Sequence, residues 1–162
     1  MLHIRPADIH DATLIYTMIR EFAEYQRELE LVSIGQEDLA RDGFGDNPHF
    51  RALIADWDGQ AAGYAIFFRY YSTWVGRGLF LQDLFVRERF RNQRIGTALL
   101  AEVARIAVDE RCYGIHWEVL DRNTKAIELY KALGAGFRDG RKSILLSGEA
   151  LRRLARQAER PR

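Results

Sequence analysis

The chain has 162 residues, 48% of them hydrophobic and 29% charged, so it can bury a core and is expected to fold as a single domain over 1–162. Its formal net charge of +1 provides no global field to attract nucleic acid or an anionic membrane. No apolar run approaches the roughly 18 residues of a membrane-spanning helix, and no secretory signal is visible. The single Cys112 excludes an internal disulfide, so a cytoplasmic protein is expected.

The first fifty residues are expected to form a strand and two helices. Residues 2–5 have the pattern of a short strand. Asp8 is placed to cap a helix whose apolar positions repeat at helical spacing to about Tyr25. Residues 36–40 indicate a second, shorter helix, which the glycines and proline of 43–48 are expected to end.

The middle of the chain predicts a hairpin, a buried strand and a long helix. The apolar runs 50–56 and 61–70 flank Asp58-Gly59, a dipeptide typical of two-residue hairpin turns. Residues 79–86 are expected to form a buried strand, and 94–111 have the apolar stripe of an amphipathic helix.

The last third predicts two strands and two helices. Strands are expected over 114–120 and 144–146, and helices over 123–133, ended by Gly134, and over 149–160. An antiparallel hairpin followed by a strand–helix–strand crossover indicates an α/β (α+β) fold with a mixed, mostly antiparallel sheet flanked by helices.

An arginine-rich turn joins the buried strand to the long helix. It carries four arginines before Gly96, namely Arg87, Arg89, Arg91 and Arg94. Backbone N–H groups at a helix N-terminus can bind a phosphate or pyrophosphate, which nearby arginines reinforce. The patterns Gly-Lys-Ser/Thr and G-x-G-x-x-G are absent, which argues against a nucleotide-hydrolase loop or a dinucleotide fold. The alternative is an ordinary strand–turn–helix with a solvated basic turn.

Five segments together resemble the GNAT family of acyl-CoA N-acyltransferases, within it the spermidine/spermine (diamine) acetyltransferase branch. The similarity extends from His3 to about Leu146. The segments that carry it are Ala23-Glu24-Tyr25, Asp42-Gly43-Phe44-Gly45, Gln82-Asp83-Leu84-Phe85-Val86, the R-x-x-x-x-G turn Arg91 to Gly96, and NTKAIELY from Asn123 to Tyr130.

The resemblance implies the GNAT fold, acetyl-CoA as cosubstrate without a metal, a small-molecule amine as acceptor, and a homodimer. It also implies that the backbone of Leu84 to Val86 pairs with the pantetheine arm like an added strand. The implied cofactor contacts are Leu84, Phe85, Val86, Arg91, Asn92, Gln93, Arg94, Ile95, Gly96, Thr97, Asn123, Lys125, Ala126 and Tyr130. The implied acceptor side is lined by Tyr25, Gln26, Gln82, His116, Trp117 and Glu118.

Two residues are expected to move protons. By the resemblance, Tyr130 lies beside the thioester sulfur, where it can protonate the departing thiolate; packing into the core is its alternative. Asp83 is a candidate base for the amine, alongside His116 and Glu118 acting through water, or else a structural acceptor for loop N–H groups. In a strand, Trp117 would face away from His116 and Glu118.

Three positions depart from the branch. Arg94 replaces the first glycine of the turn, so either its side chain points outward or cofactor binding is weakened. Gln26 and Gln82 stand where polyamine enzymes have acidic residues.

The lost charge favours a short, amino-acid-like amine whose carboxylate Arg27, Arg69 or Arg77 could offset. The alternatives are a polyamine acetyltransferase, a low-turnover CoA-binding module and, more remotely, acetylation of a protein lysine.

Overall fold

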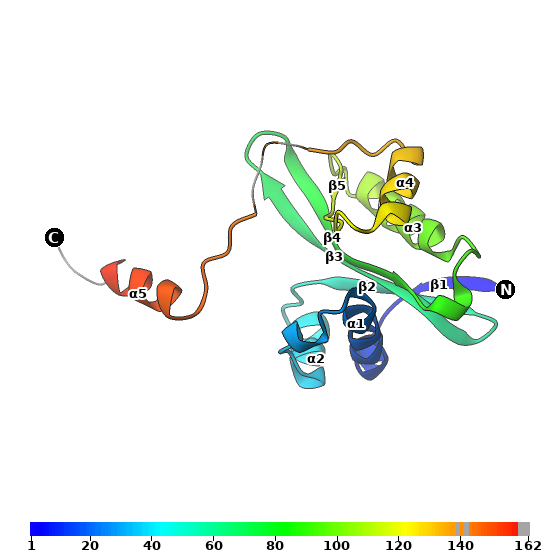
Figure 1. Ribbon diagram of the computed structural model, residues 1–162, viewed down its shortest axis with the longest axis horizontal. Helices are drawn as coiled ribbons and strands as arrows, with labels where there is room; N and C mark the ends of the chain where they lie inside the picture. Colours follow the sequence, from blue (N-terminus) through cyan, green and yellow to red (C-terminus); the bar gives the residue numbers. More distant parts are fainter. Residues whose placement is uncertain (139, 141–142, 159–162) are drawn as a thin grey trace. The chain divides into compact units, whose positions relative to one another are not determined.

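A computed structural model describes residues 1–138, 140 and 143–158 (Figure 1). The chain divides into two compact units, Met1–Glu118 and Val119–Arg162. The expectation of a single domain over 1–162 therefore stays a prediction. Within the described residues, no helix combines the length and apolarity needed to cross a membrane.

The first unit is built on a five-stranded sheet whose spatial order follows the chain. Its first four strands pair antiparallel, and the fifth pairs parallel to the fourth, which confirms the mixed, mostly antiparallel sheet. The strands are β1 (Leu2–Pro6), β2 (Arg51–Trp57), β3 (Gln60–Ser72), β4 (Gly76–Val86) and β5 (Ile115–His116). The helices of this unit are α1 (Ala12–Gln26), α2 (Gln36–Phe44) and α3 (Ile95–Asp109).

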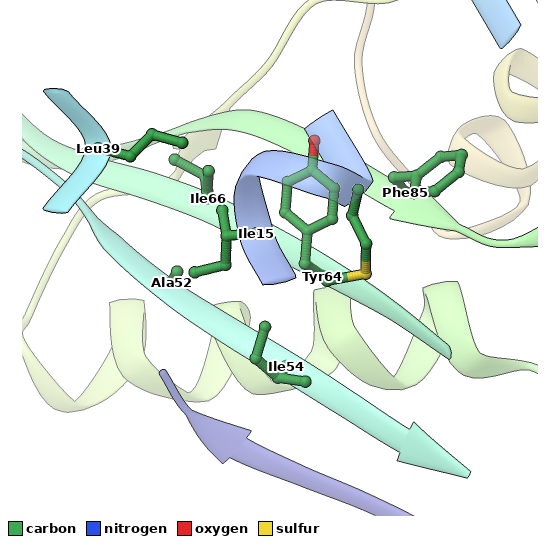
Figure 2. Packing of buried hydrophobic residues seen from close by; sticks show 8 residues of the cluster. Ile15, Leu39, Ala52, Ile54, Tyr64, Ile66 and Phe85 are labelled. Carbon is green, nitrogen blue, oxygen red and sulfur yellow. The ribbon is translucent and has the colours of Figure 1, made fainter. Parts of the chain in front are cut away.

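Helices α1 and α2 cover one face of this sheet and α3 covers the other (Figure 1). Strand side chains alternate between faces, so every second residue of β2, β3 and β4 meets α1 and α2. Figure 2 shows this core, formed by Ile15, Met18, Leu39, Ala52, Ile54, Tyr64, Ile66 and Phe85. On the opposite face, α3 buries one stripe of its surface, as its periodicity predicts.

Asp8 caps the short 3₁₀ turn Ile9–Asp11 that leads into α1, and not α1 itself, whose N-cap Asp11 makes no side-chain capping hydrogen bond. The Asp8 carboxylate accepts the His10 N–H at 2.8 Å, and Asp11 Oδ2 accepts the Asp8 N–H at 2.9 Å. Helix α2 runs past the expected residue 40, through Gly43 to Phe44, and Gly45 caps its end within the expected range 43–48. A Cβ at Gly43 would lie 2.3 Å from the Phe50 ring, so this glycine allows close packing instead of ending the helix.

The expected hairpin between β2 and β3 is confirmed. Asp58 and Gly59 have φ values of 49° and 78°, the left-handed pair that a tight two-residue turn requires.

Strand β4 contains a β-bulge at Gln82. Ile66 of β3 pairs with Asp83 whereas Phe67 pairs with Leu81, so Gln82 is an extra residue. A bulge bends its strand, and β5 pairs with β4 only at Leu79 and Phe80. The strand expected over 114–120 therefore shrinks to Ile115–His116.

The second unit contains α4 (Thr124–Ala132) and α5 (Gly148–Ala158). Asn123 caps α4 by accepting the Ala126 N–H, and Gly134 follows it with φ 84°, as expected. The strand expected over 144–146 is wrong: these residues form no strand, and Ile144 is 90% exposed. A strand requires a paired edge, which a local apolar run cannot supply. The expected end of the last helix at 159–160 lies outside the described residues.

Candidate active site

The second half of β4, beyond the bulge, has one unpaired edge. Asp83 to Val86 pair with β3 on one side. On the other side, pairing with β5 ends at Phe80, and no strand in the described part of the chain continues it. The backbone groups that face this edge between Leu84 and Val86 can therefore pair with an extended ligand, as the resemblance implies for pantetheine, although the Val86 carbonyl already accepts from Arg91 Nε.

Asp83 lies half-buried in this segment, on the face of the sheet covered by α1. The Tyr64 hydroxyl donates a hydrogen bond to Asp83 Oδ2 at 3.1 Å. Burial raises the pKa of Asp83, and the hydrogen bond from Tyr64 opposes that rise. Burial and the Asp83 carboxylate together raise the pKa of Tyr64 well above its ordinary value, so Tyr64 stays a donor. The raised pKa suits a general base, because it lies closer to neutral pH.

The structural alternative for Asp83, an acceptor of loop N–H groups, finds no support. Among the described residues, the carboxylate's hydrogen-bond partner is the Tyr64 side chain, and no loop N–H donates to it.

The turn between β4 and α3 presents a helix N-terminus without a side-chain cap. Arg94 occupies the N-cap position, and it makes no capping hydrogen bond. The first N–H groups of α3 are thus available to an anion. Asn92 and Arg94 adopt left-handed backbone, with φ values of 64° and 59°, and the Arg94 side chain is exposed. The outward side chain is confirmed, while its effect on cofactor affinity stays a prediction.

The arginines of the turn have separate roles. Arg87 donates from Nε and Nη2 to the two carboxylate oxygens of Glu21, at 2.7 Å each, and from Nη1 to the Ala61 carbonyl at 2.8 Å. It is therefore committed to joining β4, α1 and β3. Arg91 donates from Nε to the Val86 carbonyl at 3.2 Å, and its guanidinium lies 4.2 Å from the centre of the Tyr25 ring.

An open groove of about 740 Å³ lies between the end of α1 and this turn. It is lined by Glu21, Glu24, Tyr25, Phe85, Arg87, Glu88, Arg89 and Arg91. Tyr25, expected on the acceptor side, is here, whereas the three glutamates were not anticipated. The available signal was the spacing of Glu21, Glu24 and Tyr25, which places them on neighbouring parts of one helix surface.

Other expected acceptor residues lie elsewhere in the first unit. Gln26 is half-buried at the end of α1, and Gln82 is exposed at the bulge. His116 pairs with Phe80, five residues before Phe85, which places it roughly 16 Å along the strand from the groove. It sits among tyrosines, with the Tyr113 hydroxyl 3.3 Å from His116 Nε2.

The structure also revises the expectations for the two residues after β5 and for the three arginines expected to offset a substrate carboxylate. Trp117 and Glu118 follow the end of β5, so strand alternation does not decide which way they face. Arg69, expected as one of three arginines that could offset a substrate carboxylate, is paired with Glu110 at 2.8 Å. Arg77 is exposed at the start of β4 and Arg27 at the end of α1.

The remaining expected residues belong to the second unit. Asn123 precedes α4, whereas Lys125, Ala126 and Tyr130 lie on it. Tyr130 is buried, and that burial raises the pKa of its hydroxyl, which remains protonated and able to donate at neutral pH. Their contact with the cofactor stays a prediction. No group of three or more potential metal-ligating side chains occurs among the described residues.

Comparison with known proteins gives the family. Residues 13–135 match the model of the acetyltransferase (GNAT) family. A thialysine N-epsilon-acetyltransferase of Sus scrofa is 41% identical over 94% of this chain and 96% of its own. A spermidine/spermine N(1)-acetyltransferase-like protein of Homo sapiens is 33% identical over 82% of this chain and 20% of its own.

The fold has close counterparts among solved structures. An integron cassette protein from the mobile metagenome of V. cholerae superposes with a TM-score of 0.79 at 22% identity, over 95% of this chain and 97% of its own. The fold, the unpaired β4 edge and the sequence matches agree. The chain belongs to the GNAT family of acetyltransferases, in its diamine acetyltransferase branch, and is an acetyl-CoA-dependent N-acetyltransferase.

Proposed function

We propose that this enzyme acetylates the side-chain amine of a short, amino-acid-like molecule of the thialysine type. The observation that carries the chemistry is Asp83, a half-buried carboxylate of raised pKa next to the unpaired edge of β4. The thialysine acetyltransferase that is 41% identical supports the acceptor class. Neutral Gln26 and Gln82 support it too, because a polycation needs several carboxylates to offset its desolvation.

The reaction requires a neutral amine, whereas a side-chain amine of pKa ~10.4 is mostly protonated at pH 7. Asp83 accepts that proton, directly or through water. The amine nitrogen then attacks the thioester carbonyl, forming the C–N bond, and backbone N–H groups near Phe85 stabilise the oxyanion. As the C–S bond breaks, Tyr130 protonates the departing thiolate, and the remaining extra proton on the acetylated nitrogen passes through water to the Tyr130 oxygen.

An amine panel tests the proposal. With acetyl-CoA saturating and thiol release measured, kcat/KM for thialysine, lysine and ornithine should exceed that for spermidine. A clear preference for spermidine would contradict the amino-acid-like acceptor. Absence of turnover with every amine, despite acetyl-CoA binding, would instead indicate a CoA-binding module.

The Tyr130 role has its own test. Tyr130→Phe should lower kcat by about 10²- to 10⁴-fold, the usual contribution of positioned proton transfer, with little change in KM for acetyl-CoA. An unchanged kcat when chemistry is rate-limiting would leave Tyr130 as a packing residue.

Polyamine acetylation remains a second candidate because carboxylates line the groove. Glu24 and Glu88 lie there, and the spermidine/spermine acetyltransferase-like relative matches 82% of this chain. If lost charge at Gln26 and Gln82 excludes polyamines, then Gln26→Glu with Gln82→Glu should raise spermidine activity relative to lysine. An unchanged ratio would show that other residues set this preference.

We also propose a cytoplasmic homodimer that engages neither nucleic acid nor membranes. The near-neutral net charge supports the absence of polyanionic partners. The second unit supports the dimer, because Ile144 and Leu145 are 90% and 85% exposed, and large apolar side chains in such a cluster mark interfaces. Light scattering after size exclusion should give twice the chain mass; a monomer at assay concentrations would overturn this.

A further inference from the structure

The groove beside Tyr25 contains three charged side chains that form no hydrogen bond or ion pair with the described residues of the protein. Among the lining residues, Glu21 and Arg87 neutralise each other, and Arg91 covers the Tyr25 ring. Glu24, Glu88 and Arg89 remain, all exposed. Across the described residues, none of these three side chains forms a hydrogen bond or ion pair, and Arg89 has only a ring contact with Phe90 at 4.7 Å.

The backbone segments that carry these three side chains are held together by an ion pair. Glu24 belongs to α1, whereas Glu88 and Arg89 belong to the 3₁₀ turn Glu88–Phe90 that follows β4. The two walls are tied together by the bidentate pair of Glu21 with Arg87, whose side chain is only 18% exposed. Paired hydrogen bonds of this kind fix geometry as well as adding energy. One wall of the groove thus carries a negative charge from Glu24, and the other carries one negative and one positive charge from Glu88 and Arg89.

We infer that this groove binds the zwitterionic head of the acceptor: Arg89 receives the α-carboxylate, and Glu24 and Glu88 receive the α-ammonium. This inference rests on the proposed function and specifies which residues select an amino acid. The groove volume lies within the usual range for small-molecule sites, about 300–1,000 Å³.

The position of Asp83 fits this arrangement. Phe85 lines the groove, and Asp83 lies two residues earlier on the same face of β4, roughly 7 Å along the strand. That separation is comparable with the length of a lysine-type side chain. Asp83 does not itself line the groove, so a terminal amine directed along β4 exchanges its proton with the Asp83 carboxylate through water.

Two other occupants would use the same charges differently. A polyamine would engage the carboxylates and be repelled by Arg89. A phosphate of the cofactor would engage Arg89 and be repelled by Glu24 and Glu88. The inference is therefore tested by asking whether the effect of changing Arg89 depends on the α-carboxylate of the acceptor, and whether the effect of changing Glu24 depends on its α-ammonium.

The experiment compares two acceptors, thialysine and the diamine that lacks only its α-carboxylate. In Arg89→Gln, KM for thialysine should rise about tenfold, whereas KM for the diamine and for acetyl-CoA should not rise. In Glu24→Gln, KM should rise severalfold for both amines, because both carry the ammonium. Arg89→Glu should go further and reverse the preference towards the diamine.

Matched controls come from the same chain. Arg20 is an exposed arginine over a neighbouring ring, 5.9 Å from the centre of Tyr16, and lies outside the groove. Glu37 is an exposed glutamate on α2, also outside it. Arg20→Gln and Glu37→Gln should leave all three KM values unchanged.

Failure of the groove assignment can be told from failure of the proposed function. If both amines are acetylated but Arg89→Gln leaves their KM ratio unchanged, the groove does not bind the carboxylate. If this variant raises KM for acetyl-CoA instead, Arg89 serves the cofactor; either result overturns the inference. If the wild type acetylates neither amine, the proposed function fails, and calorimetric titration with thialysine decides the groove. Binding that Arg89→Gln weakens would support it, and equal or absent binding would refute it.

Discussion

The charged side chains near the two ends of strand β4 differ in how fully the protein itself pairs them. At the end before the bulge, Glu110 accepts hydrogen bonds from Arg51 at 2.6 Å and Arg69 at 2.8 Å. At the end beyond it, Asp83 has one hydroxyl partner, and Glu24, Glu88 and Arg89 have none among the described residues. A polar group that the protein satisfies itself contributes to folding, whereas one left unsatisfied is available to a ligand.

The largest expected effect is at the end of β4 beyond the bulge, where Asp83 lies. Asp83→Asn removes the proposed base and should lower kcat/KM for the amine by about 10²- to 10⁴-fold. In the wild type, burial raises the pKa of Asp83, so kcat/KM should increase with pH through that raised pKa, as the carboxylate deprotonates. This limb should vanish in the variant, and a pH profile measures it.

Tyr64→Phe provides the companion to that experiment. The Tyr64 hydroxyl favours the charged form of Asp83, so its removal should raise the pKa of Asp83 further and move the limb to higher pH. Wild-type activity in Asp83→Asn, or an unmoved limb in a folded Tyr64→Phe, would remove Asp83 from the chemistry.

A smaller effect is expected at the helix N-terminus beyond the bulge. Gly96→Val should weaken acetyl-CoA binding about tenfold or more, because its side chain occupies the space beside the first N–H groups of α3. Folding should survive, since a Cβ at Gly96 would lie 3.7 Å from Val86 Cγ2, an ordinary contact. Calorimetry gives the affinity, and thermal unfolding verifies the fold. An unchanged Kd would place the cofactor elsewhere.

At the end of β4 before the bulge, where Glu110 pairs with two arginines, the expected effect is on the free energy of unfolding. The hydrogen bond from Arg69, aided by Arg51, lowers the pKa of Glu110 from an ordinary 4.5 to about 2. A lowered folded-state pKa stabilises the protein above the unfolded pKa, and this contribution is lost as pH falls from about 4.5 towards 2. Glu110→Gln should therefore reduce the free energy of unfolding at pH 7 by about 1–2 kcal/mol, since solvent screens the exposed Arg69.

The control for that variant lies on α3, the helix whose C-cap is Glu110. Glu102 pairs with Arg105, whose side chain is 58% exposed, so Glu102→Gln should cost less than Glu110→Gln. Two results would contradict a stabilising ion-pair cluster around Glu110. One is an equal loss of unfolding free energy for both variants in urea at pH 7; the other is a loss for Glu110→Gln that persists at pH 2.

The smallest expected effect is at Arg94. Its left-handed backbone is strained for a side chain with a Cβ, so Arg94→Gly should relieve strain while adding freedom to the unfolded chain. The net result should be a stabilisation of less than about 1 kcal/mol in urea unfolding. A clear destabilisation would mean that the Arg94 side chain makes a contact that matters.

Local pattern predicted most of the first unit, because local chemistry determines it. Asp58-Gly59 set the hairpin, and the apolar stripe of 95–109 set α3. What failed depended on residues distant in sequence. The strand expected over 144–146 lacked a paired edge. The groove escaped prediction because Glu21 meets Arg87 across 66 residues, which no spacing rule reveals.

The left-handed backbone at Asn92 and Arg94 has a consequence for the timing of cofactor capture. Asparagine tolerates this conformation but arginine does not adopt it freely, so folding bears the cost of holding Arg94 there. The loop is then already shaped when a pyrophosphate arrives, and binding has little backbone entropy left to remove. Capture of acetyl-CoA should consequently follow single-step kinetics, with a rate set by encounter and not by loop closure.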